Sequence, residues 1–446
     1  MNQALYTIKN ITYILYSKNI LFMKVYIETH GCKLNIADSQ RIADQLLEQG
    51  MKISDNILDS DVYLLNTCTV TQSADKKARN KLRNIRKKNP NVHIVATGCY
   101  VERNMKEVSD LGIADTVVGN FSKENLFTII NNKFSKKITD KQEVSINNLL
   151  LGRTRASIAI QKGCNQICSY CIVPKVRGRE NSISKTVIIS RIKKLEKFGC
   201  KEVVLTGTQL GTYGYDLEDH SLHGLLKQIL DETNIDRIRL SSVQPHEFSD
   251  QLFELWNHKK YRLRLCPHFH IPLQSGSDKI LKSMRRKYTT ETFLSVVEKI
   301  KKNINNSTIT TDIIVGFPGE NSEDHNLTKT LLLNSLIKEI HVFPYSKRPG
   351  TSAYYLKDQI HSSIITIRAK EIRRISEKLK LQRLEEMIDT EQEVLWEKNK
   401  PLSGYTTNYS YYVNSQDNTT YNKNDLSKVI IKSVDKNLNL TGKIIG

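Results

Sequence analysis

The sequence contains no run of about twenty uncharged apolar residues, the length that a membrane-spanning helix needs. The best candidate, residues 11–23, is short, and Lys18 interrupts it. No small-residue cleavage site follows this stretch, so we do not expect a secretory signal peptide. We expect residues 1–22 to be an extension outside the fold, upstream of a folded protein that starts at Met23, and the chain to be cytoplasmic.

Proline and acidic residues are also scarce. The nine prolines, in a chain that is 39% hydrophobic, argue against long disordered regions. Asp and Glu number 47 against 67 Lys and Arg, so the formal net charge is +20. So positive a surface favours a polyanionic partner, and a nucleic acid is the first expectation. A generally lysine-rich proteome would give the same balance.

Short β-rich runs alternate with amphipathic stretches in the first third of the sequence, which is typical of a parallel α/β sheet. At 446 residues the chain is long enough for several domains. We expect the first, a parallel α/β domain, at residues 23–136, and a polar linker at residues 137–152. The predicted strands are residues 24–29, 61–66, 93–97 and 116–118, and the predicted helices are residues 35–48, 70–88 and 101–111.

A second alternation of strands and helices fills residues 153–385. Gly, Ser, Gln or Pro stands at or just past most of its strands, which favours an open (β/α)6 barrel with its site at the carboxyl ends of the strands. A doubly wound sheet is the alternative topology. The predicted strands are residues 157–161, 202–206, 239–243, 268–272, 310–315 and 339–344. A charged helix is expected at residues 364–387, and residues 386–446 have the size of a small β-barrel.

Three cysteines lie close together in the C-x3-C-x2-C loop of Cys164, Cys168 and Cys171. Without an export signal the cysteines are expected to be reduced, and thiols there more often bind metal than form disulfides. Three thiolates can hold three irons of a [4Fe–4S] cluster and leave the fourth iron open. A structural zinc site would need a fourth ligand nearby, and the next cysteine, Cys200, is outside the loop.

A second set of cysteines becomes visible once the strands are drawn. Cys32, Cys68 and Cys99 each follow the carboxyl end of a predicted strand of the first domain. Such ends share one edge of a parallel sheet, so the three thiols are expected to converge there. On this geometry alone, a second three-cysteine cluster and buried cysteines that pack as small apolar residues remain equal alternatives. Cys200 and Cys266 are expected to be core residues.

Five ordered motifs give the chain, from Met23 onward, a resemblance to the radical S-adenosylmethionine (SAM) methylthiotransferases. The motifs are residues 29–35, 164–179, 272–277, 312–320 and 343–351. Gly31-Cys32-Lys33 and Arg239-Leu240-Ser241 most resemble the MtaB-type branch of the family. This branch adds a methylthio group to carbon 2 of N6-threonylcarbamoyladenosine at position 37, beside the tRNA anticodon.

The resemblance implies SAM and two [4Fe–4S] clusters as cofactors. A carbon–hydrogen bond of an adenine ring is too strong for any side-chain base, so cofactors must carry the chemistry. By resemblance, the cluster on Cys164, Cys168 and Cys171 is catalytic and converts SAM to a 5′-deoxyadenosyl radical. The cluster on Cys32, Cys68 and Cys99 carries the sulphur. A flavodoxin- or ferredoxin-like electron donor is expected, and neither DNA nor a membrane is expected as a partner.

Further site residues follow from the expected barrel mouth and from the charges. Plain turns and packed strand ends are the alternative for the first group, and solvated charges for the second. Expected cofactor-binding residues are Tyr170, Gly207, Thr208, Ser242, Gln274 and Ile314. Expected RNA-binding residues are Arg177 and Arg179, with the SAM carboxylate as the alternative partner of these two, and Lys76, Arg79 and Arg83.

The tail at residues 386–446 resembles the TRAM module, a small β-barrel used for tRNA binding. Two rival functions keep the same chemistry and change the substrate, to isopentenyladenosine in tRNA or to an aspartate of a ribosomal protein. The protein substrate fits the charge of +20 less well. A third rival is a non-catalytic iron–sulphur protein that binds RNA.

Overall fold

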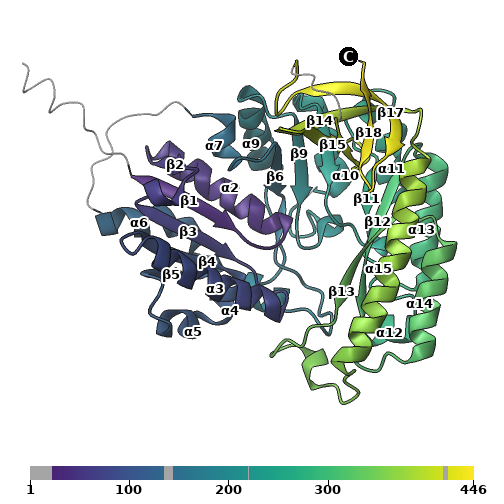
Figure 1. Ribbon diagram of the computed structural model, residues 1–446, viewed down its shortest axis with the longest axis horizontal. Helices are drawn as coiled ribbons and strands as arrows, with labels where there is room; N and C mark the ends of the chain where they lie inside the picture. The colour runs from purple at the N-terminus through teal and green to yellow at the C-terminus, as the bar shows by residue number, and fades with distance from the viewer. Residues whose placement is uncertain (1–22, 135–143, 219, 415–419, 446) are drawn as a thin grey trace, which may run out of the picture.

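The computed structural model describes residues 23–134, 144–218, 220–414 and 420–445. It shows an N-terminal sheet, a central half-barrel and a C-terminal β-barrel (Figure 1). The expected extension at residues 1–22 lies outside the described residues. Residues 137–143 of the expected linker lie outside them as well. None of the described helices is both long and apolar enough to cross a membrane.

The N-terminal sheet is parallel and has the strand order β2-β1-β3-β4-β5. Both faces are covered: α2 and α6 pack on one side, and α3 and α4 on the other. This explains why β3 is buried along its whole length and why residues 62–65 are apolar without alternation. The strands are β1 (Lys24–Thr29), β2 (Lys52–Ser54), β3 (Val62–Thr67), β4 (His93–Gly98) and β5 (Thr116–Val118). The helices are α2 (Lys33–Glu48), α3 (Gln72–Lys88), α4 (Cys99–Arg103), α5 (Met105–Asp110) and α6 (Leu126–Phe134).

Two details of this sheet differ from the sequence prediction. The edge strand β2 was not predicted, because three residues are too short to show a period. The single helix predicted at residues 101–111 is wrong. Asn104 has φ −134° and ψ 46°, a non-helical conformation that separates α4 from α5.

Six parallel strands form the central half-barrel. They lie in two three-stranded sheets, which parallel bridges join at Ile238 with Leu265 and at Ser242 with His270. The spatial order therefore follows the chain without a reversal, which rules out the doubly wound alternative and confirms the open (β/α)6 barrel. The strands are β6 (Arg155–Ala159), β9 (Glu202–Thr206), β10 (Arg237–Leu240), β11 (His268–His270), β12 (Thr308–Val315) and β13 (Glu339–Pro344).

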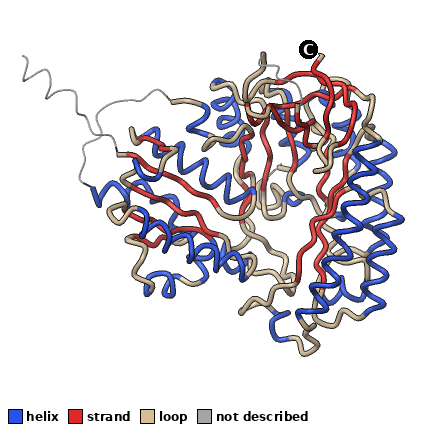
Figure 2. Tube along the Cα trace, in the orientation of Figure 1, coloured by secondary structure: helices blue, strands red, loops and turns tan. Residues whose placement is uncertain are grey.

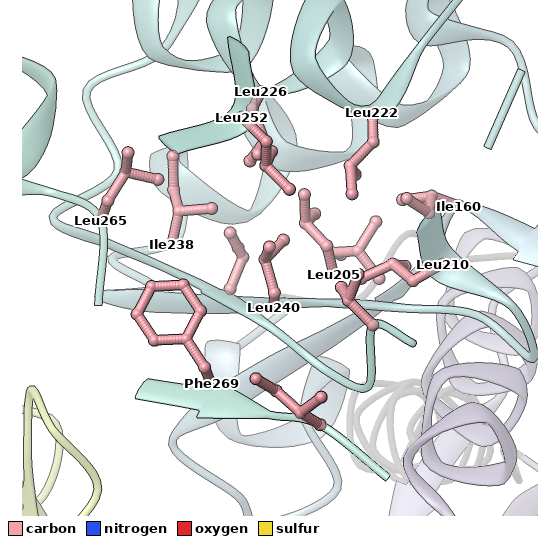
Figure 3. Packing of buried hydrophobic residues seen from close by; sticks show 14 of the residues in the cluster. Ile160, Leu205, Leu210, Leu222, Leu226, Ile238, Leu240, Leu252, Leu265 and Phe269 are labelled. Carbon is pink, nitrogen blue, oxygen red and sulfur yellow. The ribbon is translucent and has the colours of Figure 1, made fainter. Parts of the chain in front are cut away.

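Helices cover the outer side of the half-barrel (Figure 2). Leu205 and Leu240 point outward and pack against Leu226 and other helical leucines (Figure 3). The long helices are α9 (Lys185–Lys197), α10 (Leu222–Glu232), α11 (Asp250–Asn257), α13 (Thr290–Asn303), α14 (Ser322–Asn334) and α15 (Ser362–Glu385). Shorter elements are α7 (Ile146–Leu149), β7 (Gln161–Lys162), α8 (Val173–Arg177), β8 (Asn181–Ser182) and α12 (Asp278–Ser283).

The inner face of the half-barrel is polar, since residues alternate along each strand. Arg155, Glu202 and Arg239 point inward, and the residues next to them along the strands point outward into the core. Helix α2 of the N-terminal unit lies against β6, where the Gln40 side chain accepts a hydrogen bond of 2.8 Å from the amide of Ser157 (Figure 1). The polar interior thus lies between the half-barrel and the N-terminal unit.

The C-terminal strands close into a five-stranded barrel, which confirms the predicted small β-barrel. Trp396, Tyr412 and Val429 belong to its core. The loop after β15 reaches the half-barrel, where Tyr409 stacks on His268 at 4.7 Å between ring centroids. The strands are β14 (Glu391–Asn399), β15 (Leu402–Thr406), β16 (Tyr411–Val413), β17 (Leu426–Val434) and β18 (Leu440–Ile444).

Candidate active site

The sheet edge brings Cys32, Cys68 and Cys99 together, since they follow the adjacent strands β1, β3 and β4. Gly31 has φ +103°, and a Cβ there would lie 2.7 Å from the Cβ and 2.9 Å from the Sγ of Cys68. Only glycine fits this approach. Burial, together with the nearby sulphurs of Cys32 and Cys99, raises the pKa of the Cys68 thiol to about 11. The thiol is therefore neutral at pH 7 until a metal displaces its proton.

Polar side chains surround this N-terminal triad. Asn35 in the first turn of α2 donates to the carbonyls of His30 at 2.6 Å and Thr67 at 2.9 Å, and so ties two of the cysteine loops together. Asn120 lies 3.5 Å from the Sγ of Cys99. These bonds fix the loops before any ligand binds.

Arg177 is one of the side chains that surround the N-terminal triad, and it does not lie on the surface. Its side chain is 6% exposed, it hydrogen-bonds to Asn35, and its guanidinium lies 3.0 Å from the Asp38 carboxylate. Desolvation opposes its charge, but Cys99, Asp38 and Cys32 outweigh it and raise the pKa of Arg177. This position differs from the RNA contact expected of Arg177, because the guanidinium faces the cysteines and not the solvent.

The second triad occupies the loop between β7 and α8. Gly163 has φ +69°, and a Cβ there would overlap the carbonyl oxygen of Arg179. The amide of Cys164 donates to the Gly178 carbonyl at 3.1 Å, and the amide of Cys171 to the Cys168 carbonyl at 3.1 Å. The loop is therefore folded back on itself.

Burial raises the pKa of Cys164 to about 11 and that of Cys171 to about 12. One cation approaches the loop closely: Nη1 of Arg286 lies 3.2 Å from the Sγ of Cys168 and 3.5 Å from the hydroxyl of Tyr170. A guanidinium at this distance stabilises negative charge on sulphur.

A cavity of about 210 Å³ lies beside Cys171 of the second triad. Val70 and Thr71, from the loop after Cys68, line one side. Cys171 lines it together with the expected residues Tyr170, Gln274 and Ile314. Gln274 has φ +71°, and its amide donates to the carbonyl of Asp312 at 2.8 Å. Both cysteine loops therefore contribute to one cavity.

The other three expected cofactor-binding residues, Gly207, Thr208 and Ser242, lie at the mouth of the half-barrel. They do not belong to the described residues that line this cavity. The amide of Thr208 is bonded to the Gln161 side chain at 2.9 Å, and a Cβ at Gly207 would also meet Gln161. Ser242 forms the bridge between β10 and β11. Contacts within the protein therefore fix the backbone at these three positions.

Comparison with known proteins identifies the family. The model of "Uncharacterized protein family UPF0004" matches residues 24–119, and that of the "Radical SAM superfamily" matches residues 158–331. The threonylcarbamoyladenosine tRNA methylthiotransferase MtaB of Aquifex aeolicus (strain VF5) is 37% identical over 80% of this chain and 88% of its own. The protein of the same name from Bacillus subtilis (strain 168) is 34% identical over 86% of this chain and 89% of its own.

The chain belongs to the radical SAM methylthiotransferase family. Family membership makes it an enzyme that uses SAM and an iron–sulphur cluster. The tRNA-2-methylthio-N(6)-dimethylallyladenosine synthase of Endomicrobium trichonymphae is also similar, at 34% identity over 85% of this chain and 90% of its own. Among solved structures, the radical SAM methyltransferase TsrM of Kitasatospora setae has a TM-score of 0.55 at 14% identity, over 75% of this chain and 77% of that chain, which concerns the fold alone.

The sequence analysis missed several residues of this methylthiotransferase site. Asp312 lines the cavity and lies 3.1 Å from Nε2 of His270 and 3.2 Å from Nδ1 of His341. Burial alone would raise its pKa, but the two histidines lower it, so Asp312 is a carboxylate. Arg286 was missed as well. A partner from a neighbouring strand or a distant loop leaves no local motif in the sequence.

The residues expected to bind RNA differ in their surroundings. Lys76, Arg83 and Arg179 are exposed. Arg79 is 28% exposed, and Tyr100 and Glu107 hold its guanidinium at 3.0 Å and 3.1 Å. The methylthiotransferase thus presents Lys76 and Arg83 on α3 and Arg179 beside the second cysteine loop.

Proposed function

We propose that this enzyme adds a methylthio group to carbon 2 of N6-threonylcarbamoyladenosine at position 37 of tRNA, with SAM and two [4Fe–4S] clusters. One observation carries the proposal: the loop after Cys68 and the loop of the second triad line a single cavity. A base placed there would have both cofactor sites beside it. Two relatives named for this reaction support the choice of substrate.

The residues at Cys164, Cys168 and Cys171 fit a [4Fe–4S] cluster. Three free thiols stand in one loop, and Arg286 supplies positive charge beside Cys168. Such a cluster, when bound, supplies the electron that cleaves SAM. Tyr170, Gln274 and Ile314 line the cavity next to Cys171, so they orient the molecules held there. Gly207, Thr208 and Ser242 are proposed to shape the remainder of the SAM site.

The residues at Cys32, Cys68 and Cys99 fit a second cluster. All three thiols are free, and the missing Cβ of Gly31 leaves the space that Cys68 occupies. Arg177 faces these sulphurs, so its role is to balance the charge of bound thiolates. The second cluster would supply the sulphur that the product gains.

The charge distribution supports tRNA as the substrate. The net charge is +20, and Lys76, Arg83 and Arg179 are exposed for phosphate contacts. We assign the parts at residues 23–136, 153–385 and 386–446 to a methylthiotransferase, a radical SAM and a TRAM-like RNA-binding domain, joined by a linker at residues 137–152. A flavodoxin- or ferredoxin-like donor in the cytoplasm would supply the electrons.

The second candidate substrate is dimethylallyladenosine in tRNA, because relatives of that name are about as similar as the others. Mass spectrometry of nucleosides from a strain without the gene decides between the two. We expect the methylthio group to disappear from threonylcarbamoyladenosine and to stay on dimethylallyladenosine. The opposite result would refute the proposed substrate.

A further inference from the structure

We propose that Lys33 recognises a carboxylate of the substrate in a cationic chamber inside the half-barrel. The inference rests on the proposed function, since a threonylcarbamoyl group ends in a carboxylate and a dimethylallyl group has no charge. It adds a specificity-determining residue to the two cysteine triads. The chamber is a cavity of about 400 Å³ between α2, the inner face of β6, β9 and β10, and the C-terminal barrel.

Positive charge dominates the chamber. Glu397 is the single acidic residue among the described residues that line it. The cationic lining residues are Lys33, Arg153, Arg155, Arg239 and Lys398. Arg239 is buried, Lys33 and Arg155 are half-buried, and Arg153 and Lys398 are exposed. Burying a charge is costly unless an opposite charge compensates it. The lining therefore indicates an anionic ligand.

Two of the cations are already anchored. Arg155 lies 2.8 Å from Glu397, and Nε of Arg239 lies 2.7 Å from the buried carboxylate of Glu202. Arg239 also donates through Nη1 to the carbonyl of Thr407 at 2.9 Å. Its Nη2 is buried without a hydrogen-bond partner among the described residues. A buried donor without a partner is rare in proteins, and an acceptor from a ligand would satisfy it.

Lys33 differs from Arg155 and Arg239 in having no such anchor. It forms no ion pair with any described residue, and its Nζ lies 5.8 Å from the ring centroid of Tyr409. Tyr409 also lies under the guanidinium of Arg155 at 5.1 Å and of Arg239 at 4.9 Å. The ring thus gathers three cations around one side of the chamber, and of these three only Lys33 has no ion-pair partner among the described residues.

A polar column connects the chamber with the cavity beside Cys171. Asp312 in that cavity pairs with His270, whose Nδ1 lies 2.9 Å from Oγ1 of Thr310. The same oxygen lies 3.2 Å from Nε2 of His268, which stacks on Tyr409. Lys33 itself directly follows Cys32 of the N-terminal triad. The proposed pose places the base beside the triads and its carboxylate at Lys33.

Two anions share this chemistry, the carboxylate of the modified base and a phosphate of the RNA chain. The test uses tRNA anticodon stem–loops with threonylcarbamoyladenosine, with its uncharged methyl ester, with dimethylallyladenosine or with unmodified adenosine. The variants are Lys33→Met and Lys33→Arg. Lys193→Met is the matched control, because Lys193 is exposed on α9 and pairs with Glu232 at 2.9 Å. The measured quantities are kcat/KM for the methylthio product, stem–loop affinity, iron content and 5′-deoxyadenosine.

For Lys33→Met we expect kcat/KM on the carboxylate substrate to fall by roughly tenfold to a hundredfold, as for a lost charge-assisted hydrogen bond. The wild type should lose as much with the methyl ester, and the variant should lose nothing further with it, because both changes remove the same contact. Lys33→Arg should restore most of the rate. Lys193→Met should match the wild type, and iron content and 5′-deoxyadenosine should stay unchanged throughout.

Four results would overturn the inference. If the loss caused by Lys33→Met and the loss caused by the methyl ester multiply when both changes are combined, Lys33 does not contact the carboxylate. If Lys33→Met weakens binding of the unmodified stem–loop as much as the modified one, the anion is a phosphate. If wild-type enzyme modifies only the dimethylallyl stem–loop, the proposed function fails and the inference with it. Equal rates for Lys33→Met and wild type on threonylcarbamoyladenosine would refute the inference alone.

Discussion

The N-terminal triad can be tested without changing any cysteine, through Gly31→Ala. The φ of +103° strains any residue with a Cβ by about 1–2 kcal/mol. The new methyl would also lie 2.7 Å from the Cβ of Cys68, and such overpacking costs about 1–3 kcal/mol. Together these terms give a local strain of about 2–5 kcal/mol, which should displace the Cys68 loop. This is enough to impair the proposed second cluster without changing the loop of Cys164.

The assay measures iron, 5′-deoxyadenosine and methylthio nucleoside on anaerobically reconstituted protein. We expect Gly31→Ala to hold about four irons where the wild type holds about eight, since each cluster contains four. 5′-Deoxyadenosine should still form, and the methylthio product should be lost. Gly112→Ala is the matched control, because φ is +61° there and nothing lies within 4 Å of the added Cβ. Full iron content and normal product in Gly31→Ala would refute the reasoning.

The other predictions concern the second triad, the sulphur source and the RNA. Replacing Cys164, Cys168 and Cys171 together should lower the iron content from about eight to about four. An unchanged iron content would refute the assignment of a cluster to this loop. Cys68→Ala should spare 5′-deoxyadenosine and abolish methylthiolation, whereas the buried Cys200→Ala and Cys266→Ala should reduce the melting temperature and keep both reactions. Affinity for tRNA should fall steeply with salt. Lys76→Glu with Arg83→Glu should weaken binding more than Lys193→Glu, and equal affinities would exclude α3 as a contact.

The approach of the cysteine loops could be predicted because strand ends of a parallel sheet share an edge, so the positions of Cys32, Cys68 and Cys99 follow from the strands. The surroundings of these loops could not. Arg286 is 118 residues from Cys168 in the chain, and Arg177 is 139 residues from Asp38. A charge in a loop gives the same sequence signal whether it meets solvent or a buried carboxylate. Only the packing of α8 against the N-terminal unit decides between these alternatives.

Asp312 shows a second limit. It is the one charged residue of β12, a strand of threonines and aliphatic residues, and its charge indicates an inward position but not its partners. The partners, His270 and His341, come from the two neighbouring strands, so the register of β11, β12 and β13 sets the cluster. Register follows from side-chain packing over the whole sheet. It cannot be read from a strand of three residues such as β11.

The C-terminal barrel contacts buried side chains of the half-barrel's interior. Arg237 pairs with Glu393 at 2.8 Å, and Arg239 donates to Thr407 at 2.9 Å. Both guanidinium groups are buried, and these contacts would be lost together with the barrel. Ending the chain after Met387 should therefore lower the melting temperature and open the chamber around Lys33, in addition to any loss of RNA affinity. A truncated protein with an unchanged melting temperature would show that these contacts do not stabilise the half-barrel. Charge variants of the intact chain, which keep the Arg237 and Arg239 partners, are consequently the sharper test of where tRNA binds.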